Sequence, residues 1–217
     1  MIGLSLALER VNILVTNGRK KRLKADRPRR GTPAQTRARL VATAAEIFNR
    51  DGYHGTDSNR IAKEAGYATG TFYKHFKDKR EAFLAVYEAW VTSEWSAVDA
   101  ELSAGRNPEE TARRLVKLSI DFHTKWRGLR ASLIELVFTD EEVRRFYRRQ
   151  RRRQLDVIAQ LRHRLGIPSG RREDDAILLF TTERTYDAIG QGELQALGLD
   201  RDIVVEVMVE KVLALLS

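Results

Sequence analysis

The chain has no cysteine among its 217 residues and only 4 prolines. The absence of cysteine excludes disulfides, cysteine-ligated zinc, iron–sulfur clusters and thiol nucleophiles. It also fits a reducing compartment, so we expect a cytoplasmic protein. No window approaches about 18 uncharged apolar residues, so the sequence predicts no membrane span. A serine-centred nucleophile elbow, a phosphate-binding glycine loop and a zinc-binding histidine pair are also missing, and we therefore predict no enzymatic activity, no cofactor and no metal.

Positive charge is abundant, and it is concentrated at one end of the chain. The net charge of +9 favours an acidic partner such as nucleic acid. Residues 1–33 hold 9 basic and 2 acidic side chains, whereas residues 91–217 hold 21 of each. The basic stretch has too few apolar side chains to fold alone, so we interpret residues 1–33 as an extension with a flexible basic arm. Arg29 and Arg30 are its candidate DNA contacts; a tail that only aids solubility is the alternative.

The first sixteen residues are mostly apolar, with two charged residues, Glu9 and Arg10, in the middle. A signal peptide would place its cations first and keep its apolar stretch unbroken. We therefore favour a disordered segment or a start codon assigned too far upstream, with a short helix docked on a partner as the alternative.

Almost everything after Pro33 has the apolar spacing of helices, and hydrophobic residues make up 42% of the chain, enough for a core. The sequence therefore predicts an all-α fold of about nine helices. The expected ranges are 34–50, 57–65, 69–76, 78–103, 108–126, 129–138, 140–165, 172–189 and 201–216. The expected N-caps are Thr56, Asn107, Thr139 (in a capping box with Glu142) and Asp200.

Two short helices joined at Gly66 have the pattern of a helix-turn-helix motif, whose second helix enters the major groove of DNA. Phe72 and Phe76 are four residues apart and would anchor that helix. The opposite face carries the short polar groups, hydroxyls and cations that suit base edges and phosphates. The candidate contacts are Thr69, Gly70, Thr71, Tyr73, Lys74 and His75, with Lys79 one turn further on.

Residues 36–90 resemble the DNA-binding domain of TetR-family transcriptional regulators. The matching residues are Phe48, Gly52, Tyr53, Thr56, Ile61, Ala62, Ala65, Gly66, the run from Gly70 to Phe76, and Lys79. The resemblance implies that Thr56 touches a phosphate, that Thr69 and Thr71 face the groove, and that Lys79 holds a phosphate. It also implies contacts from Tyr73 and His75 to backbone or bases.

Several positions depart from the family pattern. Ala68 stands where a serine or threonine usually caps the recognition helix, and losing such a cap typically costs about 1 kcal/mol. Tyr67, Ser58 and Arg60 also replace the usual residue types. These departures leave the base preference open without changing the expected binding mode.

The resemblance further implies an all-helical C-terminal domain that binds a ligand and forms a homodimer through the last two helices. We therefore expect a DNA-binding domain at residues 34–80 and a ligand-binding and dimerisation domain at residues 81–217. The candidate dimer residues are Ile177, Phe180, Ile203, Val207, Met208 and Lys211; an ordinary intramolecular core is the alternative. Such a dimer would place two recognition helices roughly 34–36 Å apart on a near-palindromic operator.

Aromatic side chains are the candidate walls of a ligand pocket, although ordinary core positions remain the alternative for each. They are Trp90, Trp95, Phe122, Trp126, Phe138 and Tyr147. A pocket built from them would suit a bulky, mostly apolar effector.

Seven arginines lie between Arg144 and Arg153 in one expected helix. They could form a solvated face paired with Asp140, Glu141, Glu142 and Asp156. Alternatively, one arginine could turn inward to recognise an anionic ligand, or the cluster could make a second DNA contact. The sequence leaves these three interpretations open.

Taken together, the sequence patterns and the resemblance predict a dimeric, sequence-specific DNA-binding transcriptional regulator. The resemblance implies a mechanism of repression that a small molecule relieves. A nonspecific nucleoid-associated DNA binder or a helical adaptor protein is the alternative. The effector, the operator and the direction of the ligand's effect on DNA binding are not predicted.

Overall fold

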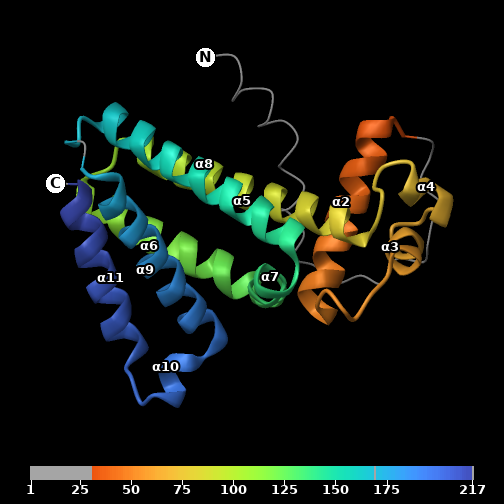
Figure 1. Cartoon of the computed structure of the whole chain (residues 1–217). Helices are drawn as coiled ribbons and strands as arrows, with labels where there is room; N and C mark the ends of the chain where they lie inside the picture. The colour runs from red at the N-terminus through yellow and green to blue at the C-terminus, as the bar shows by residue number, and fades with distance from the viewer. Residues whose placement is uncertain (1–30, 169, 217) are drawn as a thin grey trace. The chain divides into compact units, whose positions relative to one another are not determined.

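The computed structural model describes residues 31–168 and 170–216, and within them it contains ten helices and no strand (Figure 1). The predicted all-α fold is therefore confirmed. The helices are α2 (Pro33–Asp51), α3 (Ser58–Glu64), α4 (Thr69–Tyr73), α5 (Lys79–Leu102), α6 (Pro108–Lys125), α7 (Arg127–Thr139), α8 (Glu141–Leu165), α9 (Arg172–Gln191), α10 (Glu193–Ala196) and α11 (Arg201–Leu216). Arg29, Arg30 and the apolar first segment lie outside the described residues. None of the described helices is long and apolar enough to cross a membrane.

Each of the nine expected helices is present, but two local predictions differ from the structure. α4 ends at Tyr73 rather than at residue 76. Its last turn is tightened, because the N–H of His75 donates to the Phe72 carbonyl three residues back, at 2.9 Å. The four-residue α10 lies between the expected helices 172–189 and 201–216, where no helix was predicted, and it buries Leu194.

Two expected N-caps are wrong by one residue, for the same reason. The cap of α3 is Asp57 and not Thr56, and its carboxylate accepts the N–H of Arg60 at 2.8 Å. The cap of α8 is Asp140 and not Thr139, and it accepts the N–H of Glu142 at 2.9 Å. In both Thr-Asp pairs the charged carboxylate takes the position at the positive end of the helix. The caps Asn107 and Asp200 are confirmed.

The chain divides into two compact units by its internal contacts, and the functional boundary at residue 80 stays a prediction. The first unit comprises the residues up to Ser96 together with Gly128–Val143. The second unit comprises Ala97–Arg127 and Arg144–Ser217. α5 and α8 each contribute residues to both units.

The first unit is built on an aromatic and aliphatic core. Phe48, Ile61, Phe72 and Phe83 are fully buried, and the rings of Phe48 and Phe83 meet edge to face with centroids 5.2 Å apart. α3 packs against both α2 and α4. This core fixes the two short helices that the sequence identifies as a helix-turn-helix.

α7 belongs to the first unit because it begins directly on the end of α2. The N–H groups of Gly128 and Leu129 donate to the Asn49 side-chain oxygen, at 3.0 and 3.2 Å. A Cβ at Gly128 would lie only 2.0 Å from the Asn49 carbonyl oxygen. Glycine is therefore the residue that lets the two backbones approach this closely.

Replacing Gly128 by alanine is expected to lower the free energy of unfolding by about 1–3 kcal/mol, because the backbone of α2 or α7 must shift to admit the methyl group. Urea denaturation followed by circular dichroism would measure this change. Gly70→Ala is the matched control, since a Cβ there meets nothing within 4 Å. Equal stability of Gly128→Ala and the wild type would contradict the close approach.

In the second unit, α6 packs against α9 and α11, and α10 packs against α9. Gly190 permits the close packing of α9 on α6, since a Cβ there would lie 3.1 Å from the Thr124 Cα. The core consists of Ala112, Val116, Ile120, Tyr186, Ala188, Ile189, Leu194, Met208 and Val209. A buried ionisable pair crosses the same interface, where His123 Nδ1 lies 2.7 Å from Asp187 Oδ1.

Candidate nucleic-acid interface

α3, a tight turn and α4 form the helix-turn-helix that the sequence predicts. Gly66 adopts a positive φ of 83° in the turn, a conformation that favours glycine. The turn is closed by the N–H of Tyr67, which donates to the Ala62 carbonyl at 2.9 Å. Ala68 makes no side-chain capping bond to α4, as expected from its departure from the family pattern.

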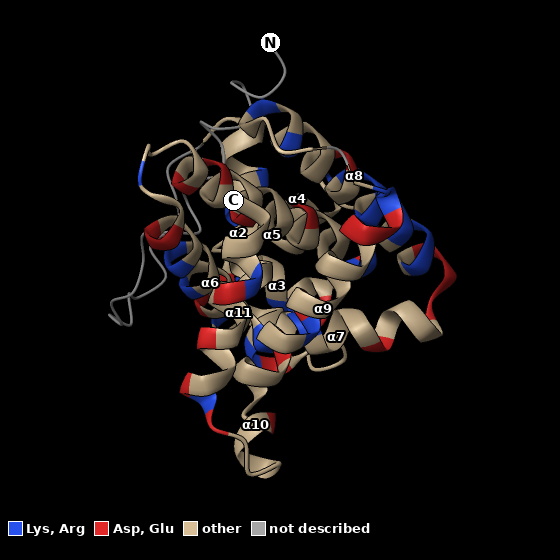
Figure 2. Cartoon of the chain, turned by 90° about the vertical axis from the view of Figure 1, so that its left-hand side faces the viewer, with Lys and Arg blue, Asp and Glu red and all other residues tan. Residues whose placement is uncertain are grey.

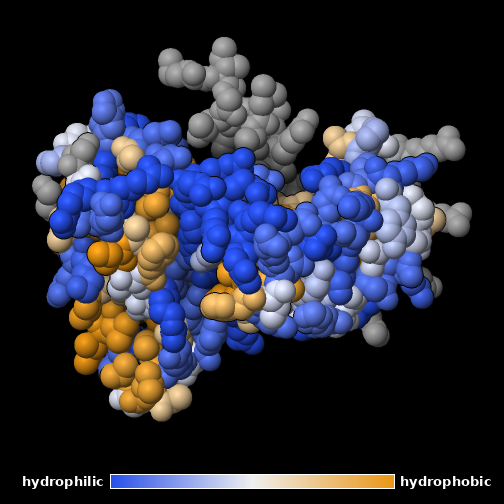
Figure 3. Space-filling view, viewed as in Figure 1, coloured by the Kyte–Doolittle hydropathy of each residue, from blue (hydrophilic) through white to orange (hydrophobic). Residues whose placement is uncertain are grey.

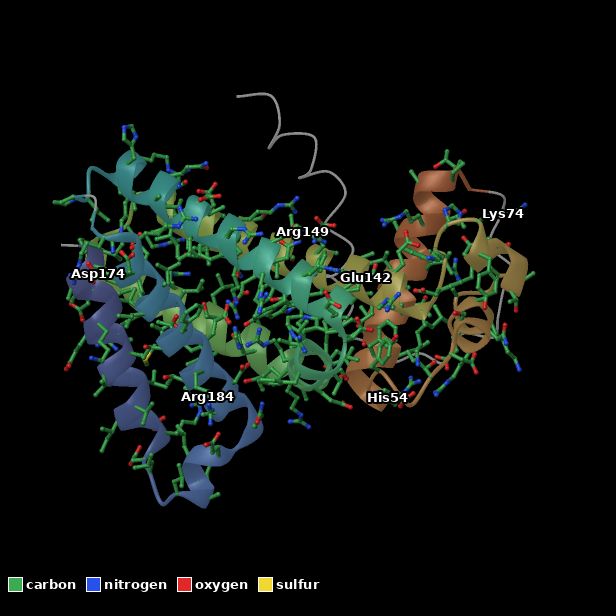
Figure 4. The ribbon with its side chains drawn as sticks, in the orientation of Figure 1. His54, Lys74, Glu142, Arg149, Asp174 and Arg184 are labelled. Carbon is green, nitrogen blue, oxygen red and sulfur yellow. The ribbon has the colours of Figure 1, made fainter. Side chains whose placement is uncertain are left out.

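The recognition segment separates its apolar and polar faces. Phe72 and Phe76 are 0% and 1% exposed, and their rings lie 5.4 Å apart in the core. On the other side, Tyr73 is 54% exposed, and Gly70 and Lys74 are also exposed; Figure 4 labels Lys74 next to α4. Thr69, Thr71 and His75 are half-buried. The segment thus presents a phenol, an ammonium and an open backbone position to solvent.

The structure does not place Thr56 where the sequence analysis expects it. The Thr56 side chain is buried, and its hydroxyl makes no hydrogen bond to the described residues. Because Asp57 caps α3, Thr56 turns into the unit instead of toward the surface. A phosphate contact from the Thr56 hydroxyl does not fit this conformation.

Lys79 is partly occupied by contacts within the first unit. Its Nζ donates to the carbonyl oxygens of Tyr53 and Thr56, at 2.9 Å each, and lies 4.1 Å from the centre of the Tyr53 ring. Burial lowers the pKa of Lys79, and the nearby Asp57 carboxylate opposes that shift. Two of its three donors hold the turn between α2 and α3, so one N–H remains for the predicted phosphate.

Two cations of α2 belong to the same surface and were missed by the sequence analysis. The guanidinium of Arg37 lies 5.0 Å from the centre of the Phe76 ring, and that of Arg39 lies 6.0 Å from the centre of the Tyr67 ring. Both arginines are exposed. Their position immediately after the basic arm was the available signal, and stacking on aromatic rings beside α4 makes them candidate phosphate contacts.

The candidate pocket residues divide by burial and lie in both units. Trp90 and Trp126 are buried, and Trp95, Phe122 and Tyr147 are half-buried, which is compatible with either a core or a pocket wall. Phe138 is 76% exposed at the end of α7, because Leu133 and Leu136 take the inward positions of that helix. Its assignment to the ligand pocket stays a prediction.

The candidate dimer residues also fall into an exposed group and a buried one. Ile177, Phe180, Ile203 and Val207 are between 42% and 64% exposed, and Lys211 is exposed. Met208 is only 3% exposed and belongs to the core of the second unit, which favours the alternative of an ordinary intramolecular core for this residue. α11 is apolar around much of its circumference, which is why spacing alone did not separate Met208 from Val207.

One arginine of the α8 cluster does turn inward. Arg151 is 9% exposed, and its guanidinium donates to both carboxylate oxygens of Glu183, to the Tyr147 hydroxyl and to Gln154 Oε1. The Glu183 carboxylate therefore already occupies the paired N–H groups of the Arg151 guanidinium. Among the described residues, no group of three or more His, Cys, Asp or Glu side chains is placed to hold a metal ion.

Comparison with known proteins agrees with this geometry. Residues 40–86 match the family model described as bacterial regulatory proteins, tetR family. The chain is 32% identical over 88 residues to the HTH-type transcriptional activator FasR of Mycolicibacterium smegmatis, a match that covers 41% of this chain and 40% of that protein. The chain thus spans less than half the length of this curated relative.

The fold of about four fifths of the chain is similar to that of solved regulators. FadR from Bacillus subtilis in complex with stearoyl-CoA aligns with a TM-score of 0.60 at 17% identity, over 81% of this chain and 96% of that one. A regulator from Saccharomonospora viridis in complex with choline aligns with a TM-score of 0.57 at 22% identity, over 82% of this chain and 94% of that one. At these identities the likeness shows the fold.

Proposed function

We propose that this chain, which carries a TetR-family DNA-binding domain at residues 40–86, is a dimeric, ligand-responsive transcriptional regulator that binds a specific DNA sequence. The observation that carries this proposal is the exposed polar face of α4 over the buried Phe72 and Phe76, within the segment that matches the family model. Residues 34–80 would bind DNA, and residues 81–217 would bind the effector and the second copy. Because the proposed target is duplex DNA, we place the protein in the cytoplasm.

On the DNA side, the exposed Tyr73 and Lys74 would reach the major groove and its edges, and Gly70 would admit the sugar-phosphate backbone closely. Thr69, Thr71 and His75 would contribute polar contacts from half-buried positions. Phosphate contacts would come from Arg37, Arg39, the remaining donor of Lys79, and Arg29 and Arg30 of the arm.

On the dimer side, exposed apolar side chains from α9 and α11 support an interface between two copies. In Figure 3 the hydrophobic colour gathers at the lower left, over α10 and α11. The exposed large apolar residues of the second unit's C-terminal half are Ile177, Phe180, Leu197, Leu199, Ile203 and Val207. Soluble monomers rarely leave so many apolar groups together in water, and a symmetric dimer would read a near-palindromic operator.

For the effector, we propose a bulky and mostly apolar molecule, which suits Phe122 and Tyr147 of the second unit as half-buried wall residues. The stearoyl-CoA complex of a protein with a similar fold supports this choice. The effector would bind preferentially to the form whose two α4 helices are spaced wrongly for the operator. α5 is the candidate lever, because its first residue, Lys79, also holds the turn between α2 and α3.

Selection of bound sequences from a random duplex pool, with the full chain at physiological salt, tests the proposal. We expect a near-palindromic consensus, and we expect Tyr73→Ala to weaken its enrichment without changing the fold, since Tyr73 is 54% exposed. Long-chain acyl-CoA is the first effector probe on the enriched duplex, and release of the duplex would support repression. Equal affinity for every duplex would instead support the nonspecific nucleoid-associated binder.

A further inference from the structure

The middle of α8 is the most cationic surface of the described chain that the proposed DNA-binding domain does not use. The segment from Val143 to Leu155 holds seven arginines, no lysine and no acidic residue. Figure 2 shows the blue of Lys and Arg gathered along α8. Arg151 is buried against Glu183, which leaves the other arginines of the cluster to be explained.

Three of the four acidic residues expected to neutralise this cluster bind arginines outside it. Asp140 and Glu142 lie 3.1 and 2.7 Å from the guanidinium nitrogens of Arg80, which is on α5. Asp156 lies 2.8 Å from a guanidinium nitrogen of Arg172, which is on α9. Most of the carboxylates expected to neutralise the cluster are therefore paired elsewhere, which argues against a solvated face that neutralises itself.

Arg145, Arg148, Arg149 and Arg152 form what we call the α8 arginine stripe. They recur at i, i+3, i+4 and i+7, which places them on one face of the helix, about 10 Å long. All four are exposed, and Arg148, Arg149 and Arg152 make no ion pair with the described residues. The guanidinium of Arg149, labelled in Figure 4, lies 5.7 Å from the centre of the Phe146 ring, which helps to hold it in place.

The chemistry of the stripe favours a phosphate backbone over a protein or lipid partner. Guanidinium groups bind phosphate oxygens in a bidentate manner. Protein interfaces and membrane-bound helices both require exposed apolar anchors, and here Val143 and Phe146 are buried. Duplex DNA carries one charge for about every 1.7 Å of its axis, so a face about 10 Å long meets several phosphates.

We propose that the α8 arginine stripe is a second, sequence-independent site that binds the phosphate backbone of duplex DNA. This site lies in the second unit and is separate from α4. It would raise the affinity of the protein for any duplex and would leave the choice of sequence to the helix-turn-helix.

The test is the triple variant Arg148→Gln, Arg149→Gln and Arg152→Gln in the full chain, bound to a duplex of random sequence at increasing salt. The slope of log affinity against log salt is expected to become shallower by about 2–3, since each phosphate contact contributes about 0.9. At about 0.1 M salt the affinity is expected to fall by roughly 100-fold. The triple Arg→Lys variant, which keeps the charge, is expected to retain most of the slope.

A second triple variant controls for net charge: Arg114→Gln, Lys117→Gln and Arg171→Gln. These three exposed cations are already paired with Glu110, Asp121 and Asp174, at 3.0, 2.8 and 3.0 Å. The proposal is overturned if this control loses as much affinity as the stripe variant, or if the stripe variant binds like the wild type.

The two proposals can fail separately. Both proposals are supported if the triple Arg→Gln variant of the stripe still selects the wild-type consensus and binds random duplex with a shallower dependence of affinity on salt. If the wild-type chain selects no consensus sequence but its salt dependence still requires the stripe, only the proposal of a sequence-specific regulator is contradicted.

Discussion

Replacing Arg151 by methionine is expected to lower the free energy of unfolding by about 3–5 kcal/mol, because it leaves a carboxylate buried without its counter-ion. Arg151 and Glu183 are 9% and 8% exposed, and the guanidinium donates to both carboxylate oxygens. Tyr147 and Gln154 complete the cluster from the same helix. Urea denaturation of the full chain, followed by circular dichroism, would measure the loss.

The partner variants identify the cause of that loss. The double variant Arg151→Met and Glu183→Leu is expected to recover most of the stability, since neither charge then remains buried. Arg152→Gln, which removes an exposed neighbour, is the matched control and is expected to change the free energy of unfolding by less than about 0.5 kcal/mol. A cost below about 1 kcal/mol for Arg151→Met would show that the pair does not hold α8 to α9 in solution.

The same pair bears on how an anionic effector could be recognised. Both terminal nitrogens of the Arg151 guanidinium donate to Glu183, so few of its N–H groups remain for a second carboxylate or a phosphate. If Arg151→Lys keeps its stability but loses binding of long-chain acyl-CoA, then the effector displaces Glu183. Loss of stability with unchanged acyl-CoA binding by the folded fraction would make the pair a purely structural link between α8 and α9.

The sequence predicted the fold well wherever local rules act alone. Helix ranges follow from apolar spacing, and Asn107 and Asp200 cap their helices as expected because no rival cap follows them. The two Thr-Asp pairs were ambiguous, since either residue can cap a helix. The end of α4 depends on one short-range hydrogen bond at His75 that side-chain spacing does not record.

Of the candidate DNA-binding site, the sequence could predict the buried and exposed faces of the recognition helix but not the long-range contacts of its cations. Phe72 and Phe76, four residues apart, identify the buried face and thereby the exposed one. In contrast, the bonds of Lys79 join it to carbonyls 23 and 26 residues away, and Arg151 turns inward because of a glutamate 32 residues away. Such long-range pairing leaves no periodic signal along the chain, so the sequence could not show which cation of a cluster is already bound.

Phe180→Glu is expected to produce a monomer whose affinity for the selected operator is about 10²–10⁴ times weaker, because only one DNA-binding domain then binds the duplex. Phe180 is 53% exposed on α9, one turn from Ile177, and the exposed Ile203 and Val207 offer a similar pair on α11. A carboxylate in the centre of such an apolar interface would lose its hydration, and the nearest guanidinium, that of Arg151 at 5.8 Å from the Phe180 ring, is already paired with Glu183. Sedimentation equilibrium and operator titration would measure the two effects.

The matched control is Phe138→Glu, which introduces the same charge at another exposed aromatic residue. Phe138 is 76% exposed and belongs to the first unit, outside the apolar surface of α9 and α11. We expect this variant to remain dimeric and to bind the operator like the wild type. If Phe180→Glu stays dimeric, the interface lies elsewhere; if its monomer binds the operator undiminished, one copy is sufficient to read the DNA. Only monomer formation together with lost affinity links the apolar surface of α9 and α11 to the spacing of the two recognition helices.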